Sequence, residues 1–248
     1  EGGPAEVRSN SRGALAAGRG LRMLLPLLFF LAAVAGGGDE AGNARFEHIG
    51  KESGLSNLSV SSIVQDHRGF LWFGTQSGLN RYDGYEFKVY KKKPFDSNSL
   101  SHDLVQTLYM DRDETLWVGT YNGLNTLDTL TGEIRRYLHD PEDPKSLSGD
   151  VVVSILRDSR GTLWVGTLNG LNRLDEETGE FTRYLHDPED PDSISNNTIR
   201  DIYEDSAGRL WIASYGGLNR FHREEQRFSA YPIDPEQTGG ETTDYIMN

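Results

Sequence analysis

The chain has 248 residues, of which 36% are hydrophobic, and its 28 glycines indicate many turns. Its formal net charge of −13 argues against the phosphate backbone of a nucleic acid as a partner. It contains no cysteine, which excludes disulfides, thiolate catalysis and cysteine-ligated metals.

The N-terminal segment has the pattern of a secretory signal. Residues 1–22 carry four arginines, and residues 23–35 form an apolar run that ends in Ala33-Val34-Ala35 before three glycines. A basic region, a short apolar run and a small-residue site predict a signal peptide over residues 1–35, followed by a linker over 36–43. The run is shorter than the ~20 residues of a spanning helix, and an uncleaved N-terminal anchor is the alternative. We therefore expect an exported bacterial protein, in the periplasm or at the cell surface.

Internal repetition dominates the rest of the sequence. The pattern Asp-x-x-Gly-x-Leu-Trp-x-Gly-Thr-x-x-Gly-Leu-Asn occurs four times and places all four tryptophans in one frame, at spacings of 45, 47 and 47 residues. Glu114 replaces the turn glycine, Ala213-Ser214 replaces Gly-Thr, and His222 replaces the aspartate that closes the other three repeats. These departures affect local turn geometry but not the assignment. The repeated positions are expected to be structural, and they are Trp72, Trp117, Trp164 and Trp211 with Gly74, Gly119, Gly166, Gly78, Gly123, Gly170 and Gly217.

Each repeat is predicted to form four short antiparallel strands: an innermost strand that is apolar on both faces, the Leu-Trp strand, the Gly-Leu-Asn strand and an outer strand. Innermost strands are expected at Val60–Gln65, Val105–Met110, Val152–Arg157 and Ile199–Glu204. Outer strands are expected at Glu86–Tyr90, Ile134–Tyr137, Phe181–Tyr184 and Phe228–Tyr231.

Radially repeated four-stranded units are typical of an all-β fold, the β-propeller, with blades here at residues 60–90, 105–137, 152–184 and 199–231. Residues 44–50 have the pattern of an outer strand that closes a last blade, and residues 244–248 that of the start of a further blade. We therefore expect about four and a half blades within residues 44–248, as part of a larger, truncated ring. A small closed ring of four or five blades is the alternative.

This repeat resembles that of the two-component regulator propeller family, as do the opening Gly54-Leu-Ser and the connectors Asp143–Ser148 and Asp190–Ser195. The resemblance implies the periplasmic sensor region of a histidine kinase, often a hybrid one, in the inner membrane. It implies an oligosaccharide or other small ligand, a homodimeric full-length receptor, and a membrane span and kinase domains downstream of this segment. We expect no cofactor and no catalytic residue in the segment itself.

Positions that vary inside the fixed frame are the candidates for ligand contact. They lie in the turn between the second and third strands, which in propellers shares a face with the connectors between blades. Aromatic rings and amides suit a carbohydrate, because they stack on sugar rings and hydrogen-bond to hydroxyls. Ordinary turn variation explains any one of these residues alone. The candidates are Gln76, Tyr121, Asn122, Asn169 and Tyr215.

Other chemistry has weaker support in the sequence. His139 and His186 occupy one repeat position, which indicates duplicated loop structure and not a metal site. The Asp-Pro-Glu-Asp-Pro runs favour rigid connectors over Ca²⁺ ligands, and the tryptophans favour a core role over sugar stacking. A scaffold for protein partners is the alternative function. A propeller glycosidase or lyase is a weaker one, since a sialidase-like site needs convergent arginines and a Tyr/Glu nucleophile pair.

Overall fold

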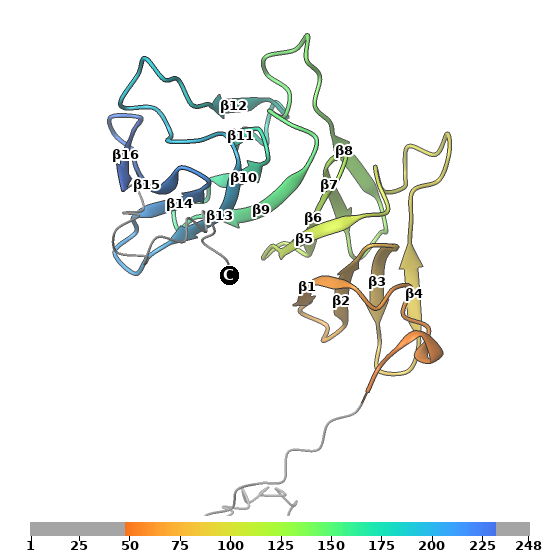
Figure 1. The fold of residues 1–248 in the computed structure, drawn as a ribbon. Coiled ribbons are helices and arrows are strands. Elements are labelled where there is room, and N and C mark those ends of the chain that lie inside the picture. The colour runs from red at the N-terminus through yellow and green to blue at the C-terminus, as the bar shows by residue number, and fades with distance from the viewer. Residues whose placement is uncertain (1–47, 232–248) are drawn as a thin grey trace, which may run out of the picture. The chain divides into compact units, whose positions relative to one another are not determined.

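The computed structural model describes residues 48–231, which form four sheets of four consecutive antiparallel strands each (Figure 1). A short 3-10 helix, η1 (Lys51–Ser53), precedes them. Blade 1 contains β1 (Val60–Gln65), β2 (Leu71–Thr75), β3 (Gly78–Tyr82) and β4 (Phe87–Tyr90). Blade 2 contains β5 (Val105–Met110), β6 (Thr115–Thr120), β7 (Gly123–Asp128) and β8 (Ile134–Tyr137). Blade 3 contains β9 (Val152–Arg157), β10 (Leu163–Thr167), β11 (Gly170–Leu174) and β12 (Phe181–Tyr184). Blade 4 contains β13 (Ile199–Glu204), β14 (Leu210–Ser214), β15 (Gly217–His222) and β16 (Arg227–Tyr231).

The strand predictions and the all-β fold of four-stranded blades are confirmed. The innermost strands begin and end at the expected residues, and each outer strand agrees to within one residue. In each blade the strands pair in sequence order, so the innermost and outer strands form the two edges of the sheet. The innermost pair contains a β-bulge in every blade, for example between Ile199 and Asp201.

The hydrophobic core lies between neighbouring blades. Trp72 of blade 1 belongs to one apolar cluster with Leu108 and Leu116 of blade 2. Trp117 and Trp164 lie in the same way against the blade that follows each of them, and all three indoles are at most 3% exposed. A single four-stranded sheet has no second layer of its own, so stacking of blades supplies the buried surface. The core role predicted for these three tryptophans is confirmed.

The first and last blades of the described part each keep one open face. Ile63 of β1 is 58% exposed, whereas its repeat counterparts Leu108, Ile155 and Ile202 are at most 8% exposed. Trp211 of blade 4 is only partly buried, because no further blade follows it within residues 48–231. A blade therefore buries its apolar face only where a neighbour covers it.

The aspartate of each repeat holds the tryptophan of the same repeat. The indole Nε1 of each tryptophan donates to Oδ2 of the aspartate six residues earlier, over 2.8–3.2 Å. In blade 3 the other oxygen, Asp158 Oδ1, accepts the backbone N–H groups of Arg160 and Thr162 and so shapes the turn. A buried indole N–H requires an acceptor, which explains why aspartate and tryptophan recur together.

Blade 2 departs from this turn, as its sequence predicts. Glu114 replaces the glycine and takes a left-handed conformation, with φ of 68° against 85° for Gly161 in blade 3. Asp111 Oδ1 accepts the N–H of the next residue, Arg112, whereas the aspartate of blade 3 accepts the N–H groups two and four residues later. The Glu114 carboxylate accepts the Thr129 hydroxyl at 3.1 Å and lies 3.0 Å from His67 Nδ1. These contacts help to offset the cost of a non-glycine residue at positive φ.

A buried polar network joins each connector to the blade that follows it. In blade 3, Ser148 donates its N–H to Asn172 Oδ1 at 2.9 Å, and its hydroxyl lies 3.0 Å from Thr167 Oγ1. The same contacts recur in the other blades. In blade 4, Ser214 supplies the hydroxyl that threonine supplies elsewhere, so the change from Gly-Thr to Ala213-Ser214 preserves the network.

Glycine occurs at the repeated positions for two different structural reasons. The first glycine of each repeat lies in a strand and makes room for the next blade: a Cβ on Gly166 would lie 2.6 Å from Ile199 Cγ2. The second glycine closes the turn after the Leu-Trp strand at φ of 99–126°, which favours glycine. Gly74, Gly119 and Gly166 belong to the first group, and Gly78, Gly123, Gly170 and Gly217 to the second.

Some predictions fall outside the described residues. They are the signal peptide (1–35), the linker (36–43), residues 44–47 of the closing strand and the start of a further blade (244–248). Residues 48–50, the described end of the predicted closing strand, form no strand and lead into η1. Within residues 48–231, no helix has the length and apolar character needed to cross a membrane.

Candidate ligand-binding face

The turns between the second and third strands lie beside the connectors, as the sequence predicts. In blade 2 the N–H of Tyr121 donates to the carbonyl of Leu104, before β5, and the N–H of Gly123 donates to Asp150, before β9. Both bonds recur at the turns of blades 1 and 3, and the first recurs in blade 4 between Tyr215 and Thr198. These turns (76–77, 121–122, 168–169 and 215–216) and the connector ends beside them are called the turn face below.

A cavity of about 350 Å³ lies among the innermost strands β1, β5, β9 and β13. Its residues occupy the second to fourth positions of these strands, toward the start of each strand. The start of each strand is next to the turn face, as where Ile199, at the start of β13, pairs with Ser214, at the edge of the turn. The polar side chains of the cavity include Ser61, Gln106, Thr107, Ser154, Arg200 and Asp201.

Arg200 connects this cavity to the turn face. Its guanidinium lies 4.2 Å from the centre of the Tyr215 ring, and its Nη2 donates to the Tyr215 hydroxyl. Asp201, the next residue, accepts the hydroxyl of Ser154 from blade 3 at 3.0 Å. A cation held on an aromatic face and a carboxylate held by a hydroxyl thus lie together at the wall of the cavity.

The five predicted ligand residues lie on the turn face, each on the turn of its own blade. Gln76, Tyr121 and Asn169 are exposed, and the Tyr121 ring lies 6.3 Å from that of His102. Tyr215 contacts the cavity through Arg200. Asn122 is half-buried. The Asn169 amide donates to the Ser148 carbonyl at 2.9 Å, so part of its hydrogen-bonding capacity already serves the fold.

Sequence reasoning missed the residues of the cavity itself. The β-bulge changes which way the second residue of each innermost strand faces, which breaks the alternation that strand patterns assume. Arg200 and Gln106 occupy this bulged position. A usable signal was present, because polar residues recur at the second and third positions of these strands, as in Gln106-Thr107 and Arg200-Asp201.

The opposite ends of the blades carry ion pairs that join neighbours. Arg157 at the end of β9 donates to Asp111 of blade 2 at 2.7 Å, and Arg223 of blade 4 pairs with Asp158 of blade 3. Burial raises the pKa of Asp158, but the hydrogen bonds from Arg223 and Trp164 outweigh it and hold the pKa below the ordinary 3.8. These carboxylates therefore stay ionised and act as structural acceptors.

The repeated histidines serve the connectors. His139 Nδ1 lies 2.6 Å from the carbonyl of Leu147, and His186 Nδ1 lies 2.8 Å from that of Ile194. The prediction of duplicated loop structure at this position is confirmed. In the part of the chain that the structure describes, no group of three or more His, Cys, Asp or Glu side chains is placed to hold a metal ion.

Four-stranded blades that stack through a repeated Trp-Asp pair define a β-propeller repeat protein. The family model described as "two component regulator propeller" matches residues 54–77, 99–122, 146–169 and 193–216. Each match covers a connector serine, an innermost strand, a Leu-Trp strand and its turn. These four segments are repeats of this family.

Two similar proteins, both described as parts of signalling systems, agree with this assignment. The extracellular domain of the putative hybrid two component system BT3049 from B. thetaiotaomicron is 31% identical with a TM-score of 0.69, over 76% of this chain and 26% of that one. Histidine kinase P4 of Formosa agariphila is 48% identical over 59 residues, which are 24% of this chain and 4% of that protein. This chain therefore spans about a quarter or less of these relatives.

A third similarity concerns the fold alone. Virginiamycin B lyase from Staphylococcus aureus has a TM-score of 0.53 at 16% identity, over 75% of this chain and 57% of that one.

Proposed function

We propose that this chain is part of the extracytoplasmic sensor of a two-component histidine kinase and binds an oligosaccharide at the turn face. The four repeats of this family and the likeness to the extracellular domain of a hybrid two component system support the sensor role. In this role the chain is an exported, periplasmic ectodomain of a homodimeric receptor in the inner membrane. The membrane span and the kinase domains lie in the remainder of that receptor.

The contact between Arg200 and Tyr215 at the cavity wall is the main support for a ligand site beside the turn face. It joins a turn-face residue to a cavity of about 350 Å³, a volume within the ~300–1,000 Å³ usual for small-molecule sites. Hydroxyl, amide, guanidinium and carboxylate groups surround the cavity. Because Arg200 and Asp201 have opposite charges, the site suits a neutral ligand whose hydroxyls both donate and accept.

A ligand in this cavity contacts strands from four blades at once. Its binding therefore favours the arrangement of blades in which all of those contacts form. In a dimeric receptor, this preference for one arrangement of blades is passed to the remaining domains, and that change is the signal.

Titration of the 248-residue chain with a panel of neutral oligosaccharides, followed by calorimetry and thermal unfolding, tests this proposal. We expect at least one oligosaccharide to raise the Tm. Arg200→Ala should weaken its binding at least about tenfold, or ~1.4 kcal/mol, because a charge-assisted donor is lost. Tyr231→Phe changes a half-exposed tyrosine on the outer strand of the same blade and should leave the affinity unchanged. No stabilisation by any oligosaccharide, or equal binding by Arg200→Ala, would falsify the carbohydrate role.

A further inference from the structure

Blade 2 differs from the other blades at the residue opposite its tryptophan. In blades 1, 3 and 4 this cross-strand partner is an arginine, whereas Trp117 pairs with Thr126. Directly opposite residues of an antiparallel pair project from the same face of the sheet. Blade 2 therefore lacks the long side chain that stands beside the indole in the other three, namely Arg81, Arg173 and Arg220.

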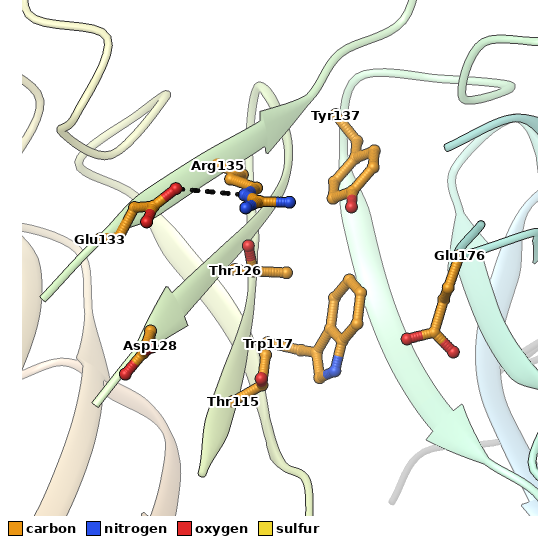
Figure 2. Close-up of a pocket in the computed structure, with 8 residues that line it drawn as sticks. All are labelled: Thr115, Trp117, Thr126, Asp128, Glu133, Arg135, Tyr137 and Glu176. Carbon is orange, nitrogen blue, oxygen red and sulfur yellow. Dashed lines mark hydrogen bonds and ion pairs between the residues drawn. The ribbon is translucent and has the colours of Figure 1, made fainter. Parts of the chain in front are cut away.

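The arginine of blade 2 lies one strand further out. Thr126 of β7 pairs with Arg135 of β8, whereas Arg173 of β11 pairs with Thr182 of β12. The two residue types are thus exchanged between the third and outer strands. A pocket of about 250 Å³ lies at this place, and Glu176 of blade 3 forms its far side (Figure 2).

An aromatic pair forms one wall of the pocket. The rings of Trp117 and Tyr137 are stacked, with centroids 6.1 Å apart and planes 29° apart. Figure 2 shows the two rings one above the other, facing Glu176 across the pocket. Trp117 is buried and supports this wall from behind, so the half-buried Tyr137 ring is the aromatic surface that can meet the apolar face of a sugar ring.

The charged groups of the pocket already have partners. Glu133 pairs with Arg135 at 3.3 Å and Glu176 pairs with Arg157 at 2.6 Å. Asp128 Oδ1 accepts the backbone N–H groups of Leu130 and Thr131. An ionic ligand would have to compete with these contacts, so the pocket does not select for net charge.

The hydroxyl groups of the pocket, in contrast, have no partners among the residues that the structure describes. Those of Thr115, Thr126 and Tyr137 make no hydrogen bond to other residues within 48–231. The equivalent tyrosine of blade 3, Tyr184, donates to Gln226 Oε1 at 2.7 Å. Three unpartnered hydroxyls beside an aromatic wall complement a ligand that carries several hydroxyls on a compact ring.

We propose that this pocket between blades 2 and 3 binds a neutral pyranose unit, at a site separate from the turn face. Its volume lies below the ~300 Å³ minimum usual for drug-sized ligands, which limits the occupant to about one sugar ring. Binding of a sugar here does not depend on the sensor role proposed above.

The test is an NMR titration of the ¹⁵N-labelled 248-residue chain with methyl α-pyranosides of gluco, galacto and manno configuration. We expect at least one to shift the assigned indole N–H signal of Trp117 more than those of the other three tryptophans, with a Kd near the millimolar range. Thr126→Arg restores the arginine of the other blades and fills the pocket, so it should raise this Kd at least about tenfold.

Thr182→Arg is the matched control. It makes the same substitution in blade 3, creates the same cross-strand arginine pair and lies outside the pocket, so the Kd should change less than about twofold. The spectra of both variants show whether the fold is retained. An unmoved Trp117 signal at about 50 mM of every pyranoside, or equal Kd values for the two variants, would overturn the proposal. Tenfold tighter binding of methyl glucuronide or methyl glucosaminide would contradict a neutral ligand, and shifts confined to the turn face would contradict this site alone.

Discussion

At the scale of single residues, one carboxylate in each blade serves several neighbours. Asp158 accepts the Trp164 indole through Oδ2 and two backbone N–H groups through Oδ1, and it pairs with Arg223 of the next blade. Asp111 makes the corresponding contacts with Trp117 and Arg157. In blades 2 and 3 the carboxylate therefore shapes the turn, accepts the core indole N–H and links two blades at once.

These carboxylates predict the pH dependence of stability. Burial raises the pKa of Asp111 and Asp158, but hydrogen bonds to the charged form outweigh it, so the folded pKa lies below the ordinary 3.8. A carboxyl of this kind stabilises the fold above its unfolded pKa, and the contribution is lost as the pH falls through the folded value. We expect the free energy of unfolding to be nearly level from about pH 5 to 7 and to fall below about pH 4.

Asp158→Asn removes one of these titrating groups and should flatten the fall in acid. Urea unfolding at several pH values from 3 to 7 measures how steeply the free energy of unfolding falls in acid, for Asp158→Asn and for the unchanged chain. Asp192→Asn, on an exposed connector, is the control. If the Asp158→Asn chain loses stability in acid as steeply as the unchanged chain, the role assigned to Asp158 is wrong.

At the scale of elements, an arginine of the outer strand fixes the connector before its own blade. Arg183 of β12 donates through Nε to the carbonyl of Ser146 at 2.7 Å, and through Nη2 to the carbonyl of Asp143 at 2.7 Å. Arg136 of β8 makes similar contacts with the connector before blade 2. Blade 4 has Ala230 at this position, so its connector lacks this clamp.

This difference predicts unequal mobility of two connectors with nearly the same sequence. Residues 139–148 should exchange backbone hydrogens more slowly than residues 186–195, because Arg183 clamps the first connector alone. Arg183→Ala should speed exchange over 139–148 about tenfold, and Ala230→Arg should slow it over 186–195. Hydrogen–deuterium exchange with mass spectrometry measures both. Unchanged exchange over 139–148 in Arg183→Ala would count against the clamp.

The strands were predictable from the sequence, whereas the cavities were not. Repetition fixed the frame, so the innermost strand Val152–Arg157 could be aligned with its three copies and bounded by their common aspartate. The turn-face position of Tyr121 and Tyr215 followed from the same alignment. Arg200 was hidden because a bulge breaks strand alternation, and the pocket at Thr126 was hidden because it depends on cross-strand register and on Glu176 of the next blade.

At the scale of the whole described part, each blade depends on its neighbours. The clusters around Trp72, Trp117 and Trp164 each combine residues of two blades. The exposed Ile63 and the half-buried Trp211 lie on faces that no neighbouring blade covers within residues 48–231. Both proposed sites combine residues from different blades, so ligand binding and blade stacking are coupled. Further blades of a longer chain would cover the two open faces.

The most direct test of this dependence compares Trp164→Phe with Trp211→Phe in the 248-residue chain. Both changes remove an indole hydrogen bond to aspartate of the same 2.8 Å length, so the difference between them isolates burial by a following blade. Urea unfolding followed by far-UV circular dichroism should give a loss of about 2 kcal/mol for Trp164→Phe and less than half of that for Trp211→Phe. Equal losses would contradict the claim that neighbouring blades bury one another's tryptophans.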